Sequence, residues 1–131
     1  MFRNARAFSG FSVDDMVAAK KFYGETLGIE MDENPQGMKL MIAGGNPVFV
    51  YAKGDHVPAT YTILNFPVED IDKAVDDLTA NGIKFEHYGD FTDERGVARG
   101  ISRNEGPDIA WFKDPAGNVL SVVEGQSGGR Q

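Results

Sequence analysis

The sequence predicts an α+β fold built from two β-α-β-β-β modules that form a curved mixed sheet with a concave cup. Three observations predict it: an apolar helical stripe occurs twice, turn signals separate short apolar runs around each stripe, and the two halves read alike. We expect a single domain over residues 1–131, with module one at 7–53 and module two at 59–124.

Two helices are predicted near residues 14–26 and 69–81, because apolar residues recur there at spacings of three and four. The stripes consist of Val13, Met16, Ala19, Phe22, Tyr23 and Leu27, and of Val68, Ile71, Ala74, Val75 and Leu78. Asp14 or Asp15 can cap the first helix, and Gly28 suits its C-terminal end. The valines that open the stripes lie 55 residues apart, an interval that fits a duplicated half-domain better than a solenoid repeat.

Strands are predicted on both sides of each helix, with Gly, Pro and Asn turns between them. The expected strands are residues 7–12, 29–33, 38–43 and 48–52 in module one, and 60–66, 84–88, 109–113 and 119–124 in module two. Each module alone leaves one sheet face partly exposed, so we expect the two sheets to lie side by side with the helices outside and the cup inside.

Composition limits the function. The formal net charge is −7 and the chain contains no cysteine. The negative field disfavours nucleic acid and anionic membranes, and no disulfide, thiolate metal site or thiol nucleophile is available. No apolar run is long enough to cross a bilayer, and the first residues do not resemble a signal peptide. We expect a soluble cytoplasmic protein with no nucleic-acid or membrane partner.

Two motifs resemble a known family. Val13-Asp14-Asp15-Met16, with Ala19, Phe22-Tyr23 and Leu27-Gly28-Ile29, resembles the opening helix of the vicinal oxygen chelate superfamily, which includes glyoxalases, bleomycin resistance proteins and extradiol dioxygenases. The segment 112–120, Phe-Lys-Asp-Pro-Ala-Gly-Asn-Val-Leu, resembles its closing hairpin. The resemblance implies this fold and a homodimer, which would also cover exposed sheet edges. It does not decide the activity, because the fold hosts lyases, isomerases, dioxygenases, thiol transferases and drug-sequestering proteins.

The resemblance also implies four metal-ligand positions, on the first and last strand of each module. Five residues before the opening valines stand Phe8 and Ile63, and four residues after the turn glycine stands Ser121. The fourth position falls within residues 48–51, which contain no carboxylate or imidazole. A divalent ion needs about three or four N or O ligands. We therefore expect no metal at the family's site and no other cofactor.

The two histidines and one long loop are the remaining polar features. His56 lies in the connector, and we interpret it as a solvated loop imidazole. On the predicted strand 84–88, His87 shares a face with Phe85, either toward the cup or toward the helix. The loop 89–107 has two open interpretations. It is a solvated excursion with internal ion pairs, or a lid over the cup in which Arg99 or Arg103 reaches an anionic group.

These observations lead to one hypothesis and two alternatives. The leading hypothesis is a metal-free binding protein that sequesters a small amphiphilic or cationic compound. The second is an enzyme of the same fold (a lyase, isomerase or dioxygenase) with relocated metal ligands, and the third is a structural or regulatory dimer. The residues expected to line the ligand cup are Phe8, Tyr51, Ile63, His87, Arg99, Trp111 and Ser121.

Overall fold

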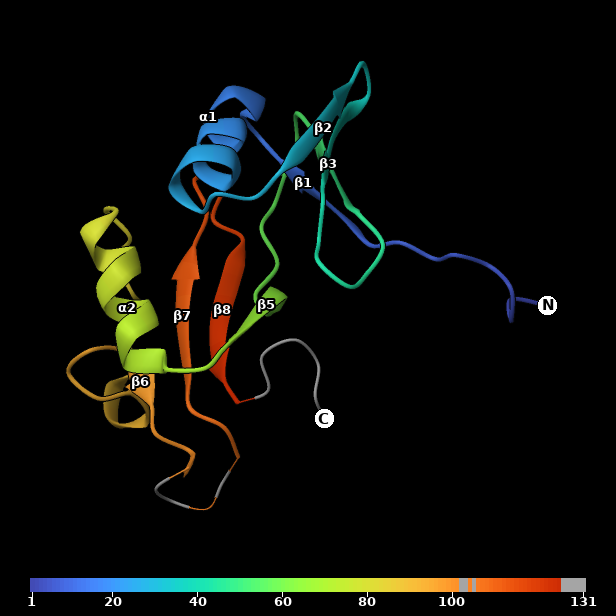
Figure 1. Ribbon diagram of the computed structural model, residues 1–131. Coiled ribbons are helices and arrows are strands. Elements are labelled where there is room, and N and C mark those ends of the chain that lie inside the picture. Colours follow the sequence, from blue (N-terminus) through green and yellow to red (C-terminus); the bar gives the residue numbers. More distant parts are fainter. Residues whose placement is uncertain (102–103, 105, 126–131) are drawn as a thin grey trace. The chain divides into compact units, whose positions relative to one another are not determined.

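The computed structural model describes residues 1–101, 104 and 106–125, and it consists of two compact units, Met1–Pro58 and Ala59–Gln131 (Figure 1). We call the units module one and module two. Each contains a four-stranded mixed sheet and one main helical segment, so the predicted α+β fold with two modules is confirmed. Within the described residues, no helix combines the length and apolar character that a membrane crossing requires.

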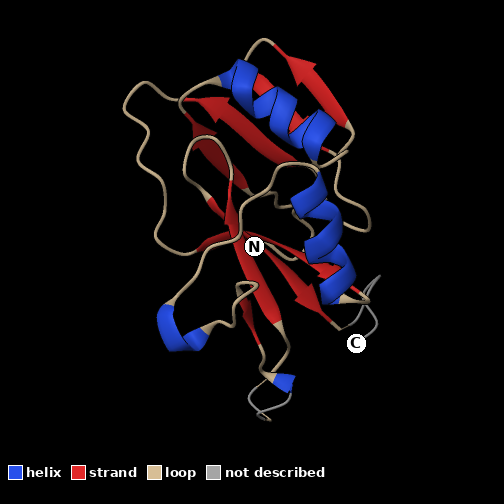
Figure 2. Ribbon diagram, turned by 90° about the vertical axis from the view of Figure 1, so that its left-hand side faces the viewer, coloured by secondary structure: helices blue, strands red, loops and turns tan. Residues whose placement is uncertain are grey.

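Module one has the strand order β1-β4-β3-β2. Its elements are β1 (Gly10–Val13), α1 (Met16–Lys20), η1 (Lys21–Thr26), β2 (Met31–Asn34), β3 (Gly37–Leu40) and β4 (Val48–Ala52). β1 is parallel to β4, and the other pairs are antiparallel. Met38 pairs with Val50 on the face that the helical segment covers (Figure 2), and both side chains are fully buried. Alternation sends the neighbouring Lys39 and Phe49 to the opposite face.

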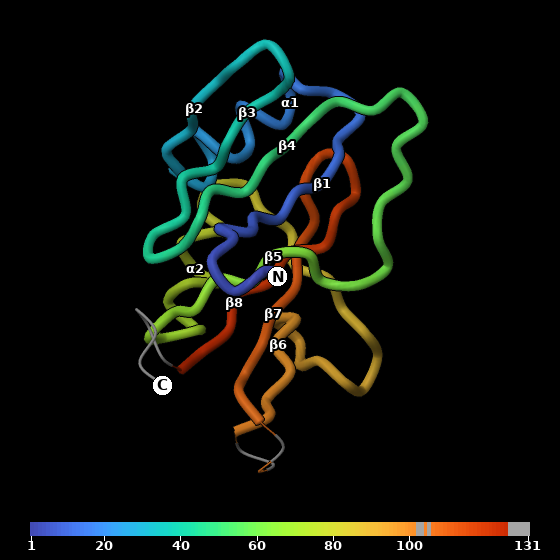
Figure 3. Tube along the Cα trace, turned by 90° about the vertical axis from the view of Figure 1, so that its right-hand side faces the viewer, coloured from blue at the N-terminus to red at the C-terminus, as the bar shows by residue number. Residues whose placement is uncertain are grey.

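Module two has the strand order β5-β8-β7-β6, which can be followed in Figure 3. Its elements are β5 (Thr62–Val68), α2 (Ile71–Ala80), η2 (Gly89–Phe91), β6 (Val97–Ala98), β7 (Ile109–Lys113) and β8 (Val119–Glu124). β5 is parallel to β8, as β1 is to β4. The helix covers the face that carries Ala110, Phe112, Leu120 and Val122, all of them buried.

The two helical segments begin in the same way. Asp15 and Asp70 are the N-caps, with backbone angles that agree within a degree, and each carboxylate accepts a hydrogen bond of 3.2 Å from the N–H group three residues later. Capping by a carboxylate satisfies one of the unpaired N–H groups of the first turn. The duplication visible in the sequence therefore extends to the geometry of the caps.

The helical segments differ by one residue, and the difference explains the π-helix η1. Fifteen residues separate Val13 from Gly28, whereas fourteen separate Val68 from Gly82. In module one the extra residue is absorbed by π-helical hydrogen bonding, in which the Leu27 N–H donates to the Phe22 carbonyl at 2.9 Å. The segment still ends at a left-handed glycine in both modules.

The predicted strand at 84–88 is wrong. Only Phe85 pairs with β7, through an isolated bridge to Phe112, and the edge strand is instead β6. If the strand continued in register from Phe85, residue 87 would pair with Ala110. In the structure Val97 pairs with Ala110 instead. Ten residues are thus inserted into the edge strand of module two. An edge position tolerates this insertion because the strand has hydrogen-bonding partners on one side only.

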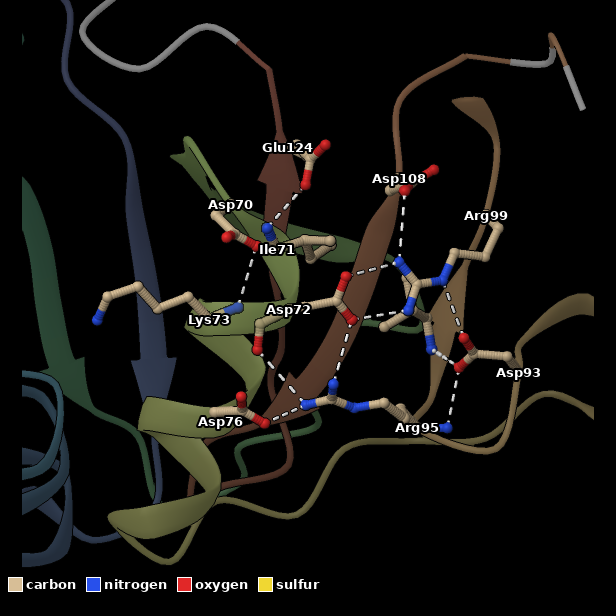
Figure 4. Close-up of polar contacts among 11 residues, drawn as sticks. Asp70, Ile71, Asp72, Lys73, Asp76, Asp93, Arg95, Arg99, Asp108 and Glu124 are labelled. Atoms are coloured by element: carbon tan, nitrogen blue, oxygen red, sulfur yellow. Dashed lines mark hydrogen bonds and ion pairs between the residues drawn. The ribbon is translucent and has the colours of Figure 1, made fainter. Parts of the chain in front are cut away.

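The inserted segment is held against α2 by an ion-pair cluster, which Figure 4 shows. The guanidinium of Arg99 donates to Asp72 at 2.8 and 3.1 Å and to Asp93 at 2.9 Å. Arg95 donates to Asp72 at 3.2 Å and also to Asp76. Asp93 in turn accepts hydrogen bonds from the N–H groups of Arg95 and Val97, which fixes the turn that leads into β6.

This cluster changes the acid–base properties of its members. Hydrogen bonds from Arg99 lower the pKa of Asp72. Partial burial alone would raise the pKa of Asp93, but hydrogen bonds from Val97, Arg99 and Arg95 outweigh it and the net pKa is lowered. The pKa of Arg99 is raised by its hydrogen bonds to Asp72 and Asp93. All three groups are therefore charged at neutral pH.

For the described residues of the loop 89–107, the structure favours the first interpretation, an excursion with internal ion pairs. Arg99, expected as a lid residue that reaches a ligand, is instead committed to aspartates of its own module. The sequence could not show this, because the acceptor Asp72 lies 27 residues earlier on a different element. Arg103, the other candidate, lies outside the described residues.

We expect Gly37→Ala to destabilise the protein and Gly45→Ala to leave its stability unchanged. A Cβ on Gly37 would lie 2.2 Å from the Val50 carbonyl oxygen, so β3 could not keep its distance from β4. A Cβ on Gly45 meets no atom within 4 Å. Urea unfolding should show a loss of about 1–3 kcal/mol for the first variant and less than about 0.5 kcal/mol for the second. Equal stability of the two variants would contradict the β3–β4 register.

We expect Arg99→Ala to lower the free energy of unfolding by about 1–2 kcal/mol at pH 7, since the charge-assisted hydrogen bonds are lost but Asp72 is half exposed. A carboxylate with a lowered pKa stabilises the fold above its unfolded value, near 3.9, and loses this contribution as the pH falls through the folded value. The difference between wild type and Arg99→Ala should therefore shrink below about pH 4.

Lys73→Ala provides the matched control for this prediction. It removes an exposed ion pair between Lys73 and Asp77 on the same helix, and it should leave the free energy of unfolding almost unchanged because water screens this pair. Chemical denaturation at a series of pH values measures all three proteins. If Arg99→Ala and Lys73→Ala are equally stable at neutral pH, the cluster does not hold the inserted segment.

Candidate functional site

The strand register identifies the fourth of the metal-ligand positions implied by the family resemblance. Gly10 pairs with Phe49 in the parallel β1–β4 ladder, and Asn65 pairs with Ser121 in the parallel β5–β8 ladder. Gly10 and Asn65 each stand three residues before the valine that opens the helical stripe of their module. Phe49 is therefore the counterpart of Ser121, and it is the residue at the fourth ligand position, which the sequence had limited to residues 48–51.

The four positions are occupied by Phe8, Phe49, Ile63 and Ser121, a set with no imidazole or carboxylate. Ile63 is half-buried at a bulge in β5. Ser121 is fully buried, and its hydroxyl donates a hydrogen bond of 2.5 Å to the Asn65 side-chain oxygen. In residues 1–101, 104 and 106–125, no three His, Cys, Asp or Glu side chains converge as a metal site would require. These residues do not fit a divalent ion.

Two of the four positions form part of a hollow in module one, of about 360 Å³, which we call the Phe8 hollow. Its apolar surface comes from Phe8, Phe49 and Pro47. Its polar surface comes from Arg6, Asn34, Gln36, Lys39 and Asn46. A hollow of this size lies at the lower end of the range for small-molecule sites.

The Phe8 hollow is formed by the alternation of side chains along β4 and by one hydrogen bond between a side chain and the backbone. Phe49 lies on the sheet face opposite the helix and stacks on Tyr51, with ring centroids 5.7 Å apart. The Asn46 side-chain NH2 donates a hydrogen bond of 2.6 Å to the Ala7 carbonyl, which holds the chain around Phe8 beside the β3–β4 loop. Phe8 itself remains 68% exposed, so a large apolar ring is offered to a ligand.

Module two contains a second hollow, of about 270 Å³, which we call the Trp111 hollow. The indole N–H of Trp111 donates to the Thr62 hydroxyl at 3.1 Å, which fixes the plane of the ring. Phe91 stacks on Trp111 and Tyr88 packs edge-on, with centroid distances of 5.8 and 5.6 Å. Partial burial, with a smaller effect of the Glu86 charge, raises the pKa of Tyr88, so its hydroxyl stays protonated at neutral pH.

The connector histidine is less exposed than the sequence suggests. His56 is half-buried, and its Nδ1 lies 2.6 Å from the Ser12 hydroxyl. The interpretation of His56 as a solvated loop imidazole is therefore wrong. Ser12 pairs with Tyr51 and shares its sheet face, so the contact ties the connector to the same face as Phe49.

The expected cup residues fall into several places. Phe8 and Trp111 each line a hollow, and Tyr51 stacks beside the first. His87 is exposed, with Nε2 3.0 Å from the Glu94 carbonyl oxygen, and lines neither hollow. Arg99 lies in the ion-pair cluster. Sequence reasoning missed Arg6, Lys39 and Asn46, although the alternation of Met38, Lys39 and Leu40 would have placed Lys39 on the open face.

Comparisons with known proteins agree with this architecture. The family described as Glyoxalase/Bleomycin resistance protein/Dioxygenase superfamily matches residues 8–122. No curated protein matches the sequence. Among solved structures, TnmS3, an antibiotic binding protein from Streptomyces sp. CB03234, is 20% identical with a TM-score of 0.67, and the match covers 96% of this chain and 99% of that one.

Two further structures show the same fold. FosX, a fosfomycin resistance protein from Listeria monocytogenes, is 15% identical with a TM-score of 0.67, over 92% of both chains. A superfamily member from Sphaerobacter thermophilus is 24% identical with a TM-score of 0.66, over 95% of this chain and 100% of that one. The family match spans most of the chain and coincides with the doubled β-α-β-β-β order. The chain therefore belongs to the Glyoxalase/Bleomycin resistance protein/Dioxygenase superfamily.

Proposed function

We propose that this protein binds a small amphiphilic molecule without a metal ion, and that it sequesters the molecule rather than transforming it. The observation that carries the proposal is the content of the four ligand positions: Phe8, Phe49, Ile63 and Ser121. Placing an ion among these side chains would remove part of its water shell without supplying replacement ligands, at a large cost in free energy.

The aromatic side chains at these positions also supply what an amphiphilic ligand needs. Phe8 and Phe49 present apolar rings to a hollow of about 360 Å³ that has polar groups on its rim. Burying such rings under a ligand is favourable by roughly 25 cal/mol per Å² of apolar surface. The same fold occurs in a protein named for antibiotic binding and in another named for fosfomycin resistance, which supports the binding of a small molecule.

A cationic compound is the other ligand chemistry that the sequence left open, and it fits the Trp111 hollow better. That hollow is lined by Trp111, Phe91, Tyr61 and Tyr88, and no charged side chain among the described residues lines it. Aromatic faces attract cations.

The alternative function is an enzyme with relocated metal ligands. His56 and His87 would have to supply those ligands together with nearby carboxylates, but His56 contacts Ser12 and His87 contacts a backbone carbonyl. We propose the binding function because no carboxylate is seen to join either imidazole in a metal-like group within the described segments.

Metal analysis combined with a melting-temperature screen tests the proposed function. We expect purified protein to hold substoichiometric Zn, Ni, Mn and Fe, and we expect a chelator to leave the melting temperature unchanged. Amphiphilic compounds that bind should raise the melting temperature. A ligand at a hundredfold excess over its Kd adds about 2.7 kcal/mol to the free energy of unfolding. One tightly held ion per chain, lost together with an activity, would instead support the enzyme.

Two variants locate the binding. Phe8→Ala should abolish the shifts that the active compounds produce, because it removes part of the apolar surface of the hollow. Phe2→Ala is the matched control, since Phe2 lies in the same N-terminal segment, is 79% exposed and lines neither hollow. Loss of binding in both variants, or in neither, would place the ligand elsewhere.

A further inference from the structure

We propose that the ligand of the Phe8 hollow carries a negative charge: a flat apolar body ending in a carboxylate or a similar anionic group. This inference rests on the proposed binding function and adds the charge of the ligand to it. It starts from the two cations of the rim, Arg6 and Lys39, which lie beside the apolar surface made by Phe8, Phe49 and Pro47.

Arg6 and Lys39 form no ion pair within the described segments, and unlike Arg3, Lys21 and Lys84, which also form none there, they lie together at one hollow. The sequence contains 20 acidic and 13 basic residues, so acidic partners are abundant. Several other cations form ion pairs with acidic residues: Lys20 pairs with Glu33, Lys113 with Glu86, and Arg99 with three aspartates. The rim of the hollow therefore carries two unpaired positive charges, although the protein as a whole has a net charge of −7.

The fold fixes at least one of these cations in place. Lys39 pairs with Phe49 across the antiparallel β3–β4 ladder, so both side chains leave the sheet on the same face. Directly opposite on β2, Asp32 pairs with Lys39, but the two make no ion pair within 4 Å and Asp32 does not line the hollow. The hydrogen bond from Asn46 to the Ala7 carbonyl holds the neighbouring Arg6 at the rim.

The hollow therefore offers one apolar surface and two positive groups beside it. An aromatic or aliphatic body would cover the phenylalanine rings, and an anionic end would accept hydrogen bonds from the Arg6 guanidinium and the Lys39 ammonium. Guanidinium suits a planar carboxylate because it can donate two parallel hydrogen bonds. Asn34 and Gln36, at the same rim, can add neutral hydrogen bonds.

Three probes with the same two-ring body and different charges test the inference: the naphthoate anion, neutral naphthamide and the naphthylmethylammonium cation. Titration calorimetry of the full chain should rank naphthoate first, about tenfold tighter than naphthamide, with the cation weakest. Increasing NaCl should weaken naphthoate and leave naphthamide unchanged, because salt screens exposed charges.

Charge-removing variants assign the preference to the two residues. The double variant Arg6→Gln with Lys39→Gln should bind naphthoate and naphthamide equally. Lys21→Gln is the matched control: Lys21 is exposed on the helical segment of the same module, forms no ion pair in the described part of the chain and does not line the hollow. It should retain the full preference for naphthoate.

The outcomes separate the inference from the function on which it rests. If naphthamide or the ammonium probe binds as tightly as naphthoate, the negative charge of the ligand is disproved and the binding function stands. The same holds if the double variant keeps the preference, because the charge selectivity then arises elsewhere. If none of the three probes binds to the wild type, both the inference and a binding role for this hollow are overturned.

Discussion

The parallel pairing of the first and last strand in each module is the constraint on which the rest of the structure depends. Val13, three residues after Gly10, is anchored in the core beneath the helical segment, and this anchor sets which residue of β4 lies beside Gly10. A shift of one residue would exchange the two sheet faces, burying Phe49 and exposing Val50. Because Val50 is fully buried and Phe49 is not, a register shifted by one residue is excluded. The side chains at the open face follow from it.

With this register, the positions at which the family resemblance implies metal ligands carry mainly apolar side chains. In module one the equivalent positions carry Phe8 and Phe49, which lie together at one hollow, and in module two they carry Ile63 and the hydrogen-bonded Ser121. Our proposal of a binding function rests on this surface. Its rings can be covered by a ligand, and the four positions supply no imidazole or carboxylate that would hold an ion able to activate water or polarise a carbonyl. In our proposal the charge of the ligand is set by the rim, where Arg6 and Lys39 have no carboxylate of the described residues within ion-pair distance.

The sequence predicted what depends on local pattern. The stripes predicted helices near 14–26 and 69–81, and the structure has them at Met16–Thr26 and Ile71–Ala80. The strand expected at 84–88 was wrong because an edge strand can be interrupted without loss of core residues, which periodicity does not show. The ion pairs of Arg99 could not be predicted because its partners are distant in sequence, and Phe49 could not be selected from its window without the register. The homodimer and the cytoplasmic location stay predictions.

The most direct test of the central claim is an NMR titration of the isotope-labelled protein with the naphthoate anion. If the anion occupies the Phe8 hollow, the amide signals of Phe8, Lys39 and Phe49 will shift progressively and saturate together, with the Trp111 indole signal unchanged. Shifts confined to Trp111 and its neighbours Tyr88 and Phe91, or no saturable shifts at all, would contradict the claim that Phe8 and Phe49 form the ligand site.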